Sequence, residues 1–300
     1  MPTLISVVGP TAIGKTKLAI DLAQHFNTEI ISADSRQFYQ EMSIGTAKPT
    51  PEELAAAPHH FVNFLPITQL YSAGDFERDA LAKLGELFKK NEVVIMVGGS
   101  GMYVDAVCKG FDNLPDIKPE IREQLNNQLA TEGLEALTTQ LAQLDPDYYN
   151  QVDLANKQRV VRALEVCLTT GKSFSSFRKQ NLVQRSFDII TVGLTWEREK
   201  IYERINQRVD QMVNQGLIEE AKALFPQRAL NALQTVGYRE IFSAINNECT
   251  LEEAITNIKT NTRRFAKRQL TWFNKNEKTT WFTREQLVNI IPFIEQQLKS

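Results

Sequence analysis

The first hundred residues alternate between short apolar runs and longer segments whose apolar residues recur every three or four positions. The runs LISVV (4–8), TEIISA (28–33) and VVIMV (93–97) are short and rich in β-branched residues, as buried strands are, and HHFVNF (59–64) is a further candidate strand. KLAIDLAQHF (17–26) and GDFERDALAKLGELFKK (74–90) have helical spacing. Strand–helix alternation of this kind predicts a parallel sheet covered by helices.

The pattern changes after NLPDIKP (113–119), a proline-bearing break. From there to about residue 180 the spacing predicts only helices, the last ending at Gly171. DIITVGLTW (188–196) then returns as a strand, helices fill the C-terminal third, and TTWF (279–282) is a candidate last strand. We therefore predict a discontinuous α/β core, residues 1–118 and 186–300, with an all-helical insertion at 119–185.

Composition narrows the choice of partners and compartment. The chain has 300 residues and a formal net charge of −2, so a polyanion would have to meet a local basic patch. Cys108, Cys167 and Cys249 lie far apart without a C-x-x-C pair, which disfavours a zinc ribbon and disulfides. No apolar run reaches membrane-spanning length and no export signal is visible, so we expect a cytoplasmic protein without a membrane partner.

GPTAIGKT (9–16) lies between the first predicted strand and the first predicted helix. Its spacing, G-x-x-x-x-G-K-[ST], is that of the P-loop, where successive backbone amides and a helix N-terminus hold phosphate oxygens. Thr16 is the candidate Mg²⁺ ligand. A chance match to this short motif is the alternative. The residues expected to bind phosphate are Gly9, Pro10, Thr11, Ala12, Ile13, Gly14, Lys15 and Thr16. The predicted fold class is thus an α/β, P-loop-containing parallel sheet with an inserted all-helical domain.

A carboxylate is expected beside this loop. P-loop enzymes often place an Asp at the end of a second apolar strand, but VVIMV ends in Gly98-Gly99-Ser100. The acid that does follow an apolar strand is Asp34, and the carboxyl ends of parallel strands meet at one edge of the sheet. Alternatively, Asp34 has no role in the site and only caps a helix that begins at residues 34–37.

Six ordered segments together resemble the tRNA dimethylallyltransferases in their compact bacterial form. They are GPTAIGKT (9–16), ISADSRQFYQEMSIGTAKP (31–49), VGGSGMY (97–103), NKQRVVRALEV (156–166), TVGYRE (235–240) and RFAKRQLTWF (264–273). The sequence departs from the family at Ile13, where Ser is usual, and at Ser100, where Thr is usual. The C-terminal zinc finger of the eukaryotic members is absent.

The resemblance implies a reaction. A dimethylallyl group would pass from dimethylallyl diphosphate to the exocyclic amine of the adenosine 3′-adjacent to the tRNA anticodon, with Mg²⁺ held by Thr16. Lys15 would stabilise the departing diphosphate, Ser100 would donate to the leaving oxygen, and Asp34 would be the general base. The adenosine would have to be flipped out of its stack to react.

The resemblance also implies contacts with the tRNA anticodon stem-loop, and no obligate protein partner. The implied contacts are Asp34, Ser35, Arg36, Gln37, Ser100, Arg122, Gln158, Arg159, Val160, Val161, Arg162, Gly237, Tyr238, Arg239, Lys267, Arg268 and Gln269. Helical spacing in residues 157–168 puts Gln158, Arg162 and Glu165 opposite an apolar stripe, with Arg159 at the edge of that polar face. A solvated polar face would look the same.

The helix near the C-terminus carries a second cluster of cations. Its predicted buried stripe is Ile255, Ile258, Thr262, Phe265 and Ala266. On the other side, Arg263, Arg264, Lys267 and Arg268 could meet diphosphate, contact RNA or only solvate the helix. Trp272 and Phe273 are expected in the core, and His59 and His60 are expected to be structural rather than metal ligands.

Three other functions fit parts of the pattern. A small-molecule kinase of the shikimate-kinase type also has an N-terminal P-loop, but it is shorter and carries an Asp-x-Asp and an Arg-rich lid. A cytokinin-type prenyltransferase acting on free adenylate would not need the basic helical insertion. A non-catalytic RNA-binding module gated by a nucleotide would transfer no group. Whether ATP binds the P-loop, which tRNAs react, the length of the prenyl donor and the oligomeric state stay open.

Overall fold

The computed structural model describes residues 1–110, 115, 117–178 and 184–299. The chain divides into two compact units. One unit contains Met1–Cys108 and Arg185–Ser300, and the other contains Lys109–Gln184. They are called here the core unit and the helical unit. Part of the proline-bearing break predicted near residue 115 lies outside the described residues.

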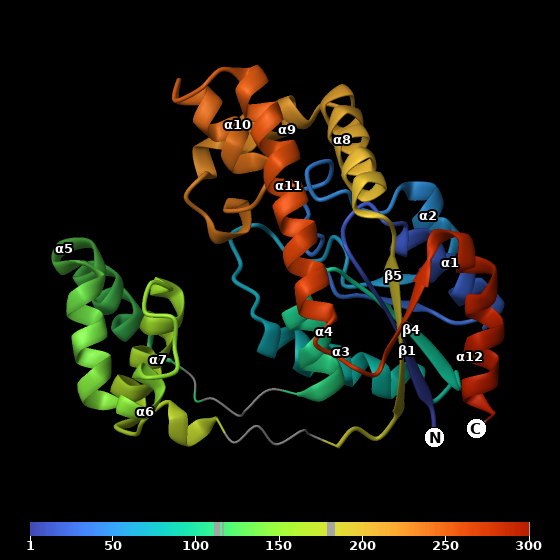
Figure 1. Cartoon of the computed structure of the whole chain (residues 1–300), viewed down its shortest axis with the longest axis horizontal. Helices are drawn as coiled ribbons and strands as arrows, with labels where there is room; N and C mark the ends of the chain where they lie inside the picture. Colours follow the sequence, from blue (N-terminus) through green and yellow to red (C-terminus); the bar gives the residue numbers. More distant parts are fainter. Residues whose placement is uncertain (111–114, 116, 179–183, 300) are drawn as a thin grey trace. The chain divides into compact units, whose positions relative to one another are not determined.

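A six-stranded parallel sheet organises the core unit (Figure 1). Its strands are β1 (Thr3–Val8), β2 (Ile30–Ser32), β3 (His59–His60), β4 (Val93–Val97), β5 (Asp188–Thr195) and β6 (Thr279–Thr283). The order across the sheet is β3-β2-β4-β1-β5-β6. Every β1 residue is buried because β4 and β5 flank this strand and helices cover both faces. The predicted α/β class with a parallel sheet is confirmed.

Some helices of the core unit cover the sheet, whereas those between β5 and β6 pack chiefly on one another, beyond the strands (Figure 1). The helices of the core unit are α1 (Lys15–His25), α2 (Pro51–Ala56), α3 (Ala73–Leu87), α4 (Gly101–Lys109), α8 (Arg198–Asn214), α9 (Leu217–Leu224), α10 (Tyr238–Ile245), α11 (Leu251–Phe273) and α12 (Ile290–Leu298). Short 3₁₀ turns lie at η2 (Phe225–Gln227), η3 (Asn231–Leu233) and η4 (Arg284–Asn289). Capping boxes begin α2 at Thr50, α3 at Ser72 and α11 at Thr250, where the side chains satisfy amides that have no partner within the helix.

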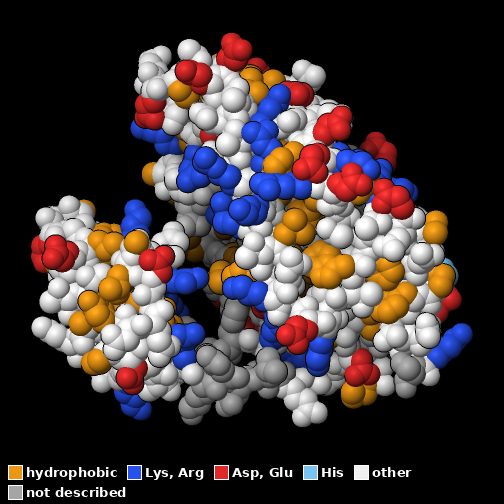
Figure 2. Space-filling view, in the orientation of Figure 1, with side chains coloured by type: hydrophobic (Ala, Val, Ile, Leu, Met, Phe, Trp, Pro, Cys, Tyr) orange, Lys and Arg blue, Asp and Glu red, His pale blue; other side chains and the backbone are white. Residues whose placement is uncertain are grey.

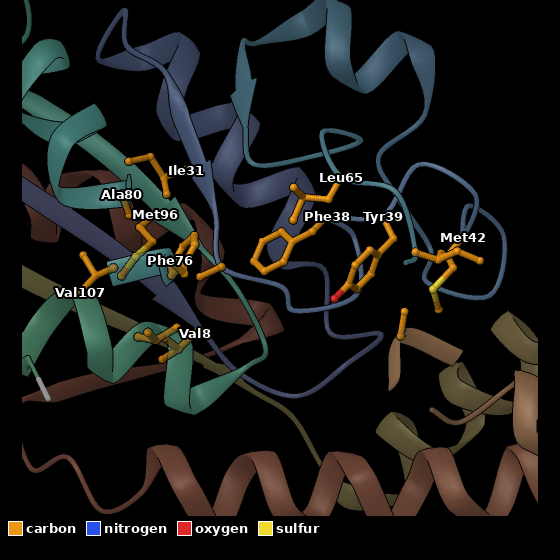
Figure 3. Close-up of a cluster of buried hydrophobic side chains, with 14 of the residues drawn as sticks. Val8, Ile31, Phe38, Tyr39, Met42, Leu65, Phe76, Ala80, Met96 and Val107 are labelled. Atoms are coloured by element: carbon orange, nitrogen blue, oxygen red, sulfur yellow. The ribbon is translucent and has the colours of Figure 1, made fainter. Parts of the chain in front are cut away.

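Alternate strand residues supply two hydrophobic cores, one on each face. Leu4 and Val8 of β1 join one cluster, whereas Ile5 and Val7 join the other. Figure 3 shows part of the first cluster, in which Phe38 stacks on Phe76 with ring centroids 5.5 Å apart. Phe38 follows β2, so this packing anchors the chain just beyond the carboxyl end of that strand.

The helical unit has its own core. It consists of α5 (Pro119–Leu144), α6 (Pro146–Tyr149), α7 (Lys157–Thr170) and η1 (Ser175–Phe177). Leu125, Leu137 and Leu141 pack with α7 residues such as Leu164. The buried Asp145 carboxylate accepts hydrogen bonds from the backbone of Tyr148 (3.0 Å) and Ser175 (2.7 Å). Gly171 adopts a left-handed conformation and ends α7, where the sequence predicts the stop.

No helix within the described part of the chain combines the length and apolar character needed to cross a membrane.

Candidate active site

The P-loop connects β1 to α1 at the carboxyl edge of the sheet. Gly9 and Gly14 have φ of 143° and 109°, and Ala12 has φ of 63°, so the backbone curls in a way that favours glycine. Helix α1 has no side-chain cap, which leaves its first amides available to an anion. The Ile13 side chain is buried in the core, so where Ser is usual this loop offers only its backbone at position 13.

Lys15 lies at the centre of this loop. Its Nζ donates to the Pro10 carbonyl oxygen at 2.7 Å, which holds the ammonium within the loop. Burial lowers the pKa of Lys15 to about 7, and the opposing charge of Asp34 only partly offsets this effect. A bound anion would favour the charged ammonium again.

Two arginines that the sequence analysis did not single out complete the charge of this site. Arg204 and Arg208 are one turn apart on α8. Arg204 Nε donates to the Ala12 carbonyl oxygen (2.8 Å), and Arg208 Nη1 lies 3.4 Å from Thr11 Oγ1. Burial lowers the pKa of both guanidinium groups. Their four-residue spacing shows in the sequence that Arg204 and Arg208 share one face of a helix. The local sequence does not show that this helix lies beside the P-loop.

A cavity of about 420 Å³, called here the phosphate cavity, is lined by the P-loop and by these cations. Asp34 also lines it, from the loop after β2. The alternative role of Asp34, as the cap of a helix, does not apply: residues 35–38 form turns, and Asp34 Oδ1 accepts from the Arg36 amide at 3.0 Å. The short side chain of Asp is suited to this turn. The bond to the Arg36 amide uses only Oδ1 of Asp34, so Oδ2 takes no part in it.

Ser100 lies beside Asp34, as the sheet topology requires. Its Oγ accepts from the Ser35 amide (3.0 Å) and lies 3.1 Å from Ser35 Oγ. A Cβ on Gly98 would collide with the Ala33 carbonyl oxygen, so the ends of β2 and β4 approach this closely only with glycine there. Gln37, in contrast, donates to the carbonyl oxygens of Thr46 (3.2 Å) and Ala47 (3.1 Å) and supports the neighbouring loop.

A second cavity of about 560 Å³, the acceptor cavity, adjoins the first. Its wall combines apolar side chains, among them Met102, Tyr103 and Trp272, with the polar Ser35 and Ser100. Both cavities share the lining residues Thr11, Asp34, Thr46, Gly99, Arg208, Phe265 and Gln269. The two cavities therefore meet along these residues, of which Asp34 carries the carboxylate.

Gln269 ties together the two loops that border this junction. Its side chain is buried, Oε1 accepts from the Thr11 amide (2.8 Å) and Nε2 donates to the Gly99 carbonyl oxygen (2.9 Å). Both ends of the amide are thus occupied within the protein. We expect Gln269 to set the separation of the P-loop from the Gly99 turn rather than to reach RNA.

Helix α11 differs from its predicted pattern at two aromatic residues. Phe265 and Trp272 are each 38% exposed rather than buried, and both line the acceptor cavity. The buried stripe runs instead through Ala254, Ile258, Ala266, Gln269 and Phe273. A face beside a cavity need not be covered by protein, and helical periodicity cannot distinguish it from a core-facing stripe. Phe273 is buried, as expected.

The remaining core-unit residues that were predicted to contact tRNA lie in different places. Arg36, Gly237, Arg239 and Arg268 line the acceptor cavity. Tyr238 is buried instead, and its hydroxyl donates to Glu220 at 2.7 Å. Along the outside of α11 lies a shallow hollow lined by Arg264, Lys267, Arg268, Thr271, Trp272 and Lys275. Lys and Arg side chains gather over this part of the surface in Figure 2.

In the helical unit, Glu165 differs from its expected exposure. Glu165, expected on the exposed polar face, is 2% exposed. Arg122 of α5 covers it with bonds from Nε (2.6 Å) and Nη2 (3.1 Å), and Arg162 adds a third bond at 3.2 Å. Gln158 and Arg159 are exposed, whereas Val160 and Val161 are buried. Only a partner helix, invisible to the periodicity of α7, explains the burial of this carboxylate.

The two histidines make structural contacts. The Nδ1 atom of His59 is 2.8 Å from the Ala57 carbonyl oxygen, and His60 Nε2 is 2.6 Å from Glu29 Oε2. No group of three or more His, Cys, Asp or Glu residues among the described positions is arranged to hold a metal ion. The Thr16 hydroxyl lines the phosphate cavity and is an oxygen donor of the kind that suits Mg²⁺.

The fold and the site are those of a P-loop α/β enzyme. A sequence model of the family described as IPP transferase matches residues 37–276. The tRNA dimethylallyltransferase of Christiangramia forsetii is 55% identical over 298 residues, covering 99% of both chains. That of Flavobacterium johnsoniae is 53% identical over 307 residues, covering 100% of this chain and 99% of the relative. This chain belongs to the tRNA dimethylallyltransferase family, a family of prenyl-transferring enzymes.

Solved structures agree with this assignment. The tRNA isopentenylpyrophosphate transferase of Bacillus halodurans is 38% identical, with a TM-score of 0.74 over 100% of this chain and 97% of that one. A eukaryotic dimethylallyltransferase acting on tRNA is 25% identical, with a TM-score of 0.82 over 99% of this chain and 80% of that one. The predicted family and its enzymatic class are therefore confirmed.

Arg122→Ala should destabilise the helical unit by about 1–3 kcal/mol, because the buried Glu165 would keep only its bond to Arg162. Arg159→Ala is the matched control: this exposed side chain sits on the same helix as Glu165, and the cost should stay within about 0.5 kcal/mol. Hydrogen exchange of α5 and α7 amides measures the difference. Equal protection in the two variants would show that the Arg122–Glu165 pair does not stabilise this unit.

Proposed function

We propose that the chain transfers a dimethylallyl group from dimethylallyl diphosphate to the exocyclic amine of an adenosine in tRNA, 3′-adjacent to the anticodon. The observation that carries this proposal is the junction of the two cavities at Asp34. One cavity suits an anion and the other suits a flat, largely apolar base. A carboxylate at their junction is where a proton must be taken when donor and acceptor combine.

The phosphate cavity would hold the diphosphate of the donor. Breaking the allylic C–O bond leaves negative charge on the diphosphate, and fixed cations stabilise that charge as it grows. Lys15, Arg204 and Arg208 supply such cations, and the amides of residues 12–16 supply hydrogen-bond donors. The Thr16 hydroxyl would hold Mg²⁺, which would supply further neutralisation of the charge on the leaving group. Ser100, which lines the acceptor cavity, would turn its hydroxyl away from Ser35 Oγ to donate to the leaving oxygen.

The acceptor cavity would take the adenosine, flipped out of the anticodon loop. Its N6 lone pair forms the new bond to C1 of the donor while the C1–O bond breaks and its electron pair leaves with the diphosphate. The proton lost by N6 passes to Asp34. An exocyclic adenine amine is a weak nucleophile, so this carboxylate, at the edge of both cavities, is required for an effective rate.

Basic surfaces of both units would hold the tRNA. Around the acceptor cavity, Arg36, Arg239 and Arg268 are placed to meet the anticodon loop, with Lys267 beyond them on α11. In the helical unit, residues 119–185, we propose that Gln158, Arg159 and the partly exposed Arg122 and Arg162 contact the anticodon arm. Because tRNA is a substrate of the cytoplasm, we expect the enzyme to act there. We also expect it to need no obligate protein partner.

Mass spectrometry of nucleosides from an unmodified tRNA transcript tests the proposal. Incubation with the protein, Mg²⁺ and dimethylallyl diphosphate should convert one adenosine to N6-isopentenyladenosine. Incubation with free adenylate in place of tRNA should give no product, and ATP should not be consumed. Transfer to free adenylate alone would favour the cytokinin-type alternative, and ATP turnover without RNA would favour a kinase.

Asp34→Asn should lower the single-turnover transfer rate by roughly 10²- to 10⁴-fold, the usual contribution of a positioned base. Asn has nearly the same shape and can keep the turn bond to the Arg36 amide, so donor affinity should change little. Rapid-quench transfer assays and donor-binding titrations separate the two quantities. A near-wild-type transfer rate would exclude Asp34 as the base.

Donor binding should take up a proton above pH 7. Lys15 has a pKa of about 7 in the free protein, and a diphosphate beside it favours the charged form, which raises that pKa. Affinity should therefore fall by about tenfold per pH unit as pH rises from 7 toward the higher, ligand-bound pKa.

Calorimetry of dimethylallyl diphosphate binding at pH 8, in buffers of different ionisation enthalpy and without Mg²⁺, measures this proton. Wild type should take up close to one proton. Lys15→Arg, whose guanidinium stays charged, should take up none. Equal uptake by both proteins would assign the proton to another group.

A further inference from the structure

Phe265 of α11 lies where the two cavities meet. It lines both cavities, and among the described residues that do so it is the one hydrophobic side chain. The others are polar or glycine: Thr11, Asp34, Thr46, Gly99, Arg208 and Gln269. Its ring is 38% exposed, so it does not serve as a core residue of α11.

The backbone that carries this ring is fixed from several sides. Ala266, the next residue, is 1% exposed in the core. One turn further on, Gln269 binds both the P-loop and the Gly99 turn. Arg263 Nη1 donates to Asn206 of α8 at 2.8 Å, and Trp272 Nε1 donates to Asp105 at 2.8 Å. The ring is therefore held at the cavity junction by a helix that cannot easily withdraw.

The proposed reaction needs something at this junction that cations and carboxylates do not supply. As the C1–O bond lengthens, positive charge grows on the five-carbon allyl group, close to Lys15 and Arg208, which repel it. A second carboxylate would compete for the diphosphate cations or capture the allyl group. The face of an aromatic ring attracts a cation without being a strong nucleophile.

We propose that Phe265 is a catalytic residue whose ring faces the allyl group and stabilises the positive charge that develops there. This inference rests on the proposed function. The ring can lie near a cation: the Arg268 guanidinium carbon is 5.7 Å from its centroid, close to the outer limit of such contacts. The ring changes no bond in the reaction. It lowers the energy of the state in which the electron pair has moved toward the diphosphate and the N6–C1 bond is incomplete.

A series of fluorinated phenylalanines at position 265 separates this role from apolar packing. Each added fluorine withdraws electron density from the ring face but makes the ring more hydrophobic. The single-turnover rate should fall with each fluorine, reaching about 10-fold for the trifluorinated ring. Donor affinity should stay within about twofold, because the ground-state diphosphate ester carries no allylic charge. Phe265→Tyr should keep most of the rate, and Phe265→Leu should lose about 10-fold.

Phe64 provides the matched control. It is 37% exposed but lines neither cavity, so the same fluorinated residues there should leave the rate unchanged. A flat rate across the series at position 265, or an equal loss at both positions, would overturn the catalytic assignment. If the wild-type protein transfers no dimethylallyl group at all, the proposed function itself fails. If the wild type is active but the fluorinated series gives a flat rate, only the role of Phe265 fails.

Discussion

The site depends on how closely the carboxyl ends of β1, β2 and β4 are held together. These strands are neighbours in one parallel sheet, so the loops that follow them emerge at the same edge. Gly98 permits β4 to approach the Ala33 carbonyl, and the Gln269 amide joins the P-loop to the Gly99 turn. These two close contacts bring Lys15, Asp34 and Ser100 into one small volume. Each comes from a different strand end, so a small slip of one strand would separate them.

Charge is distributed unevenly across this volume. The phosphate cavity gathers Lys15, Arg204 and Arg208, and burial already lowers the pKa of each. The free site thus concentrates positive charge, which a bound diphosphate would offset. The acceptor cavity is more apolar, and Asp34 and Phe265 are among the residues that line both cavities. In the proposed reaction, negative charge would develop on the cationic side. The proton would pass to Asp34, the one carboxylate among the described residues that line both cavities.

Local sequence patterns were sufficient to predict that the P-loop and Asp34 lie together. The P-loop follows a buried strand and begins a helix, and Asp34 lies just after another strand, so sheet topology alone brings them together. Arg204 and Arg208 could not be found in this way, because their role depends on α8 crossing the P-loop. The burial of Glu165 and the exposure of Phe265 and Trp272 were missed for the same reason. Periodicity tells which residues share a helix face, whereas the packing partner determines whether that face meets core, cavity or water.

In the proposed reaction, donor and acceptor reach the junction from two different cavities. The adenine amine would then approach C1 from the side opposite the departing diphosphate. The most direct measurement uses dimethylallyl diphosphate with one deuterium of known configuration at C1 and determines the configuration at that carbon in the product nucleoside. We expect complete inversion. Retention would indicate a covalent intermediate or attack from the diphosphate side, and racemisation would indicate an allyl cation free to turn within the site.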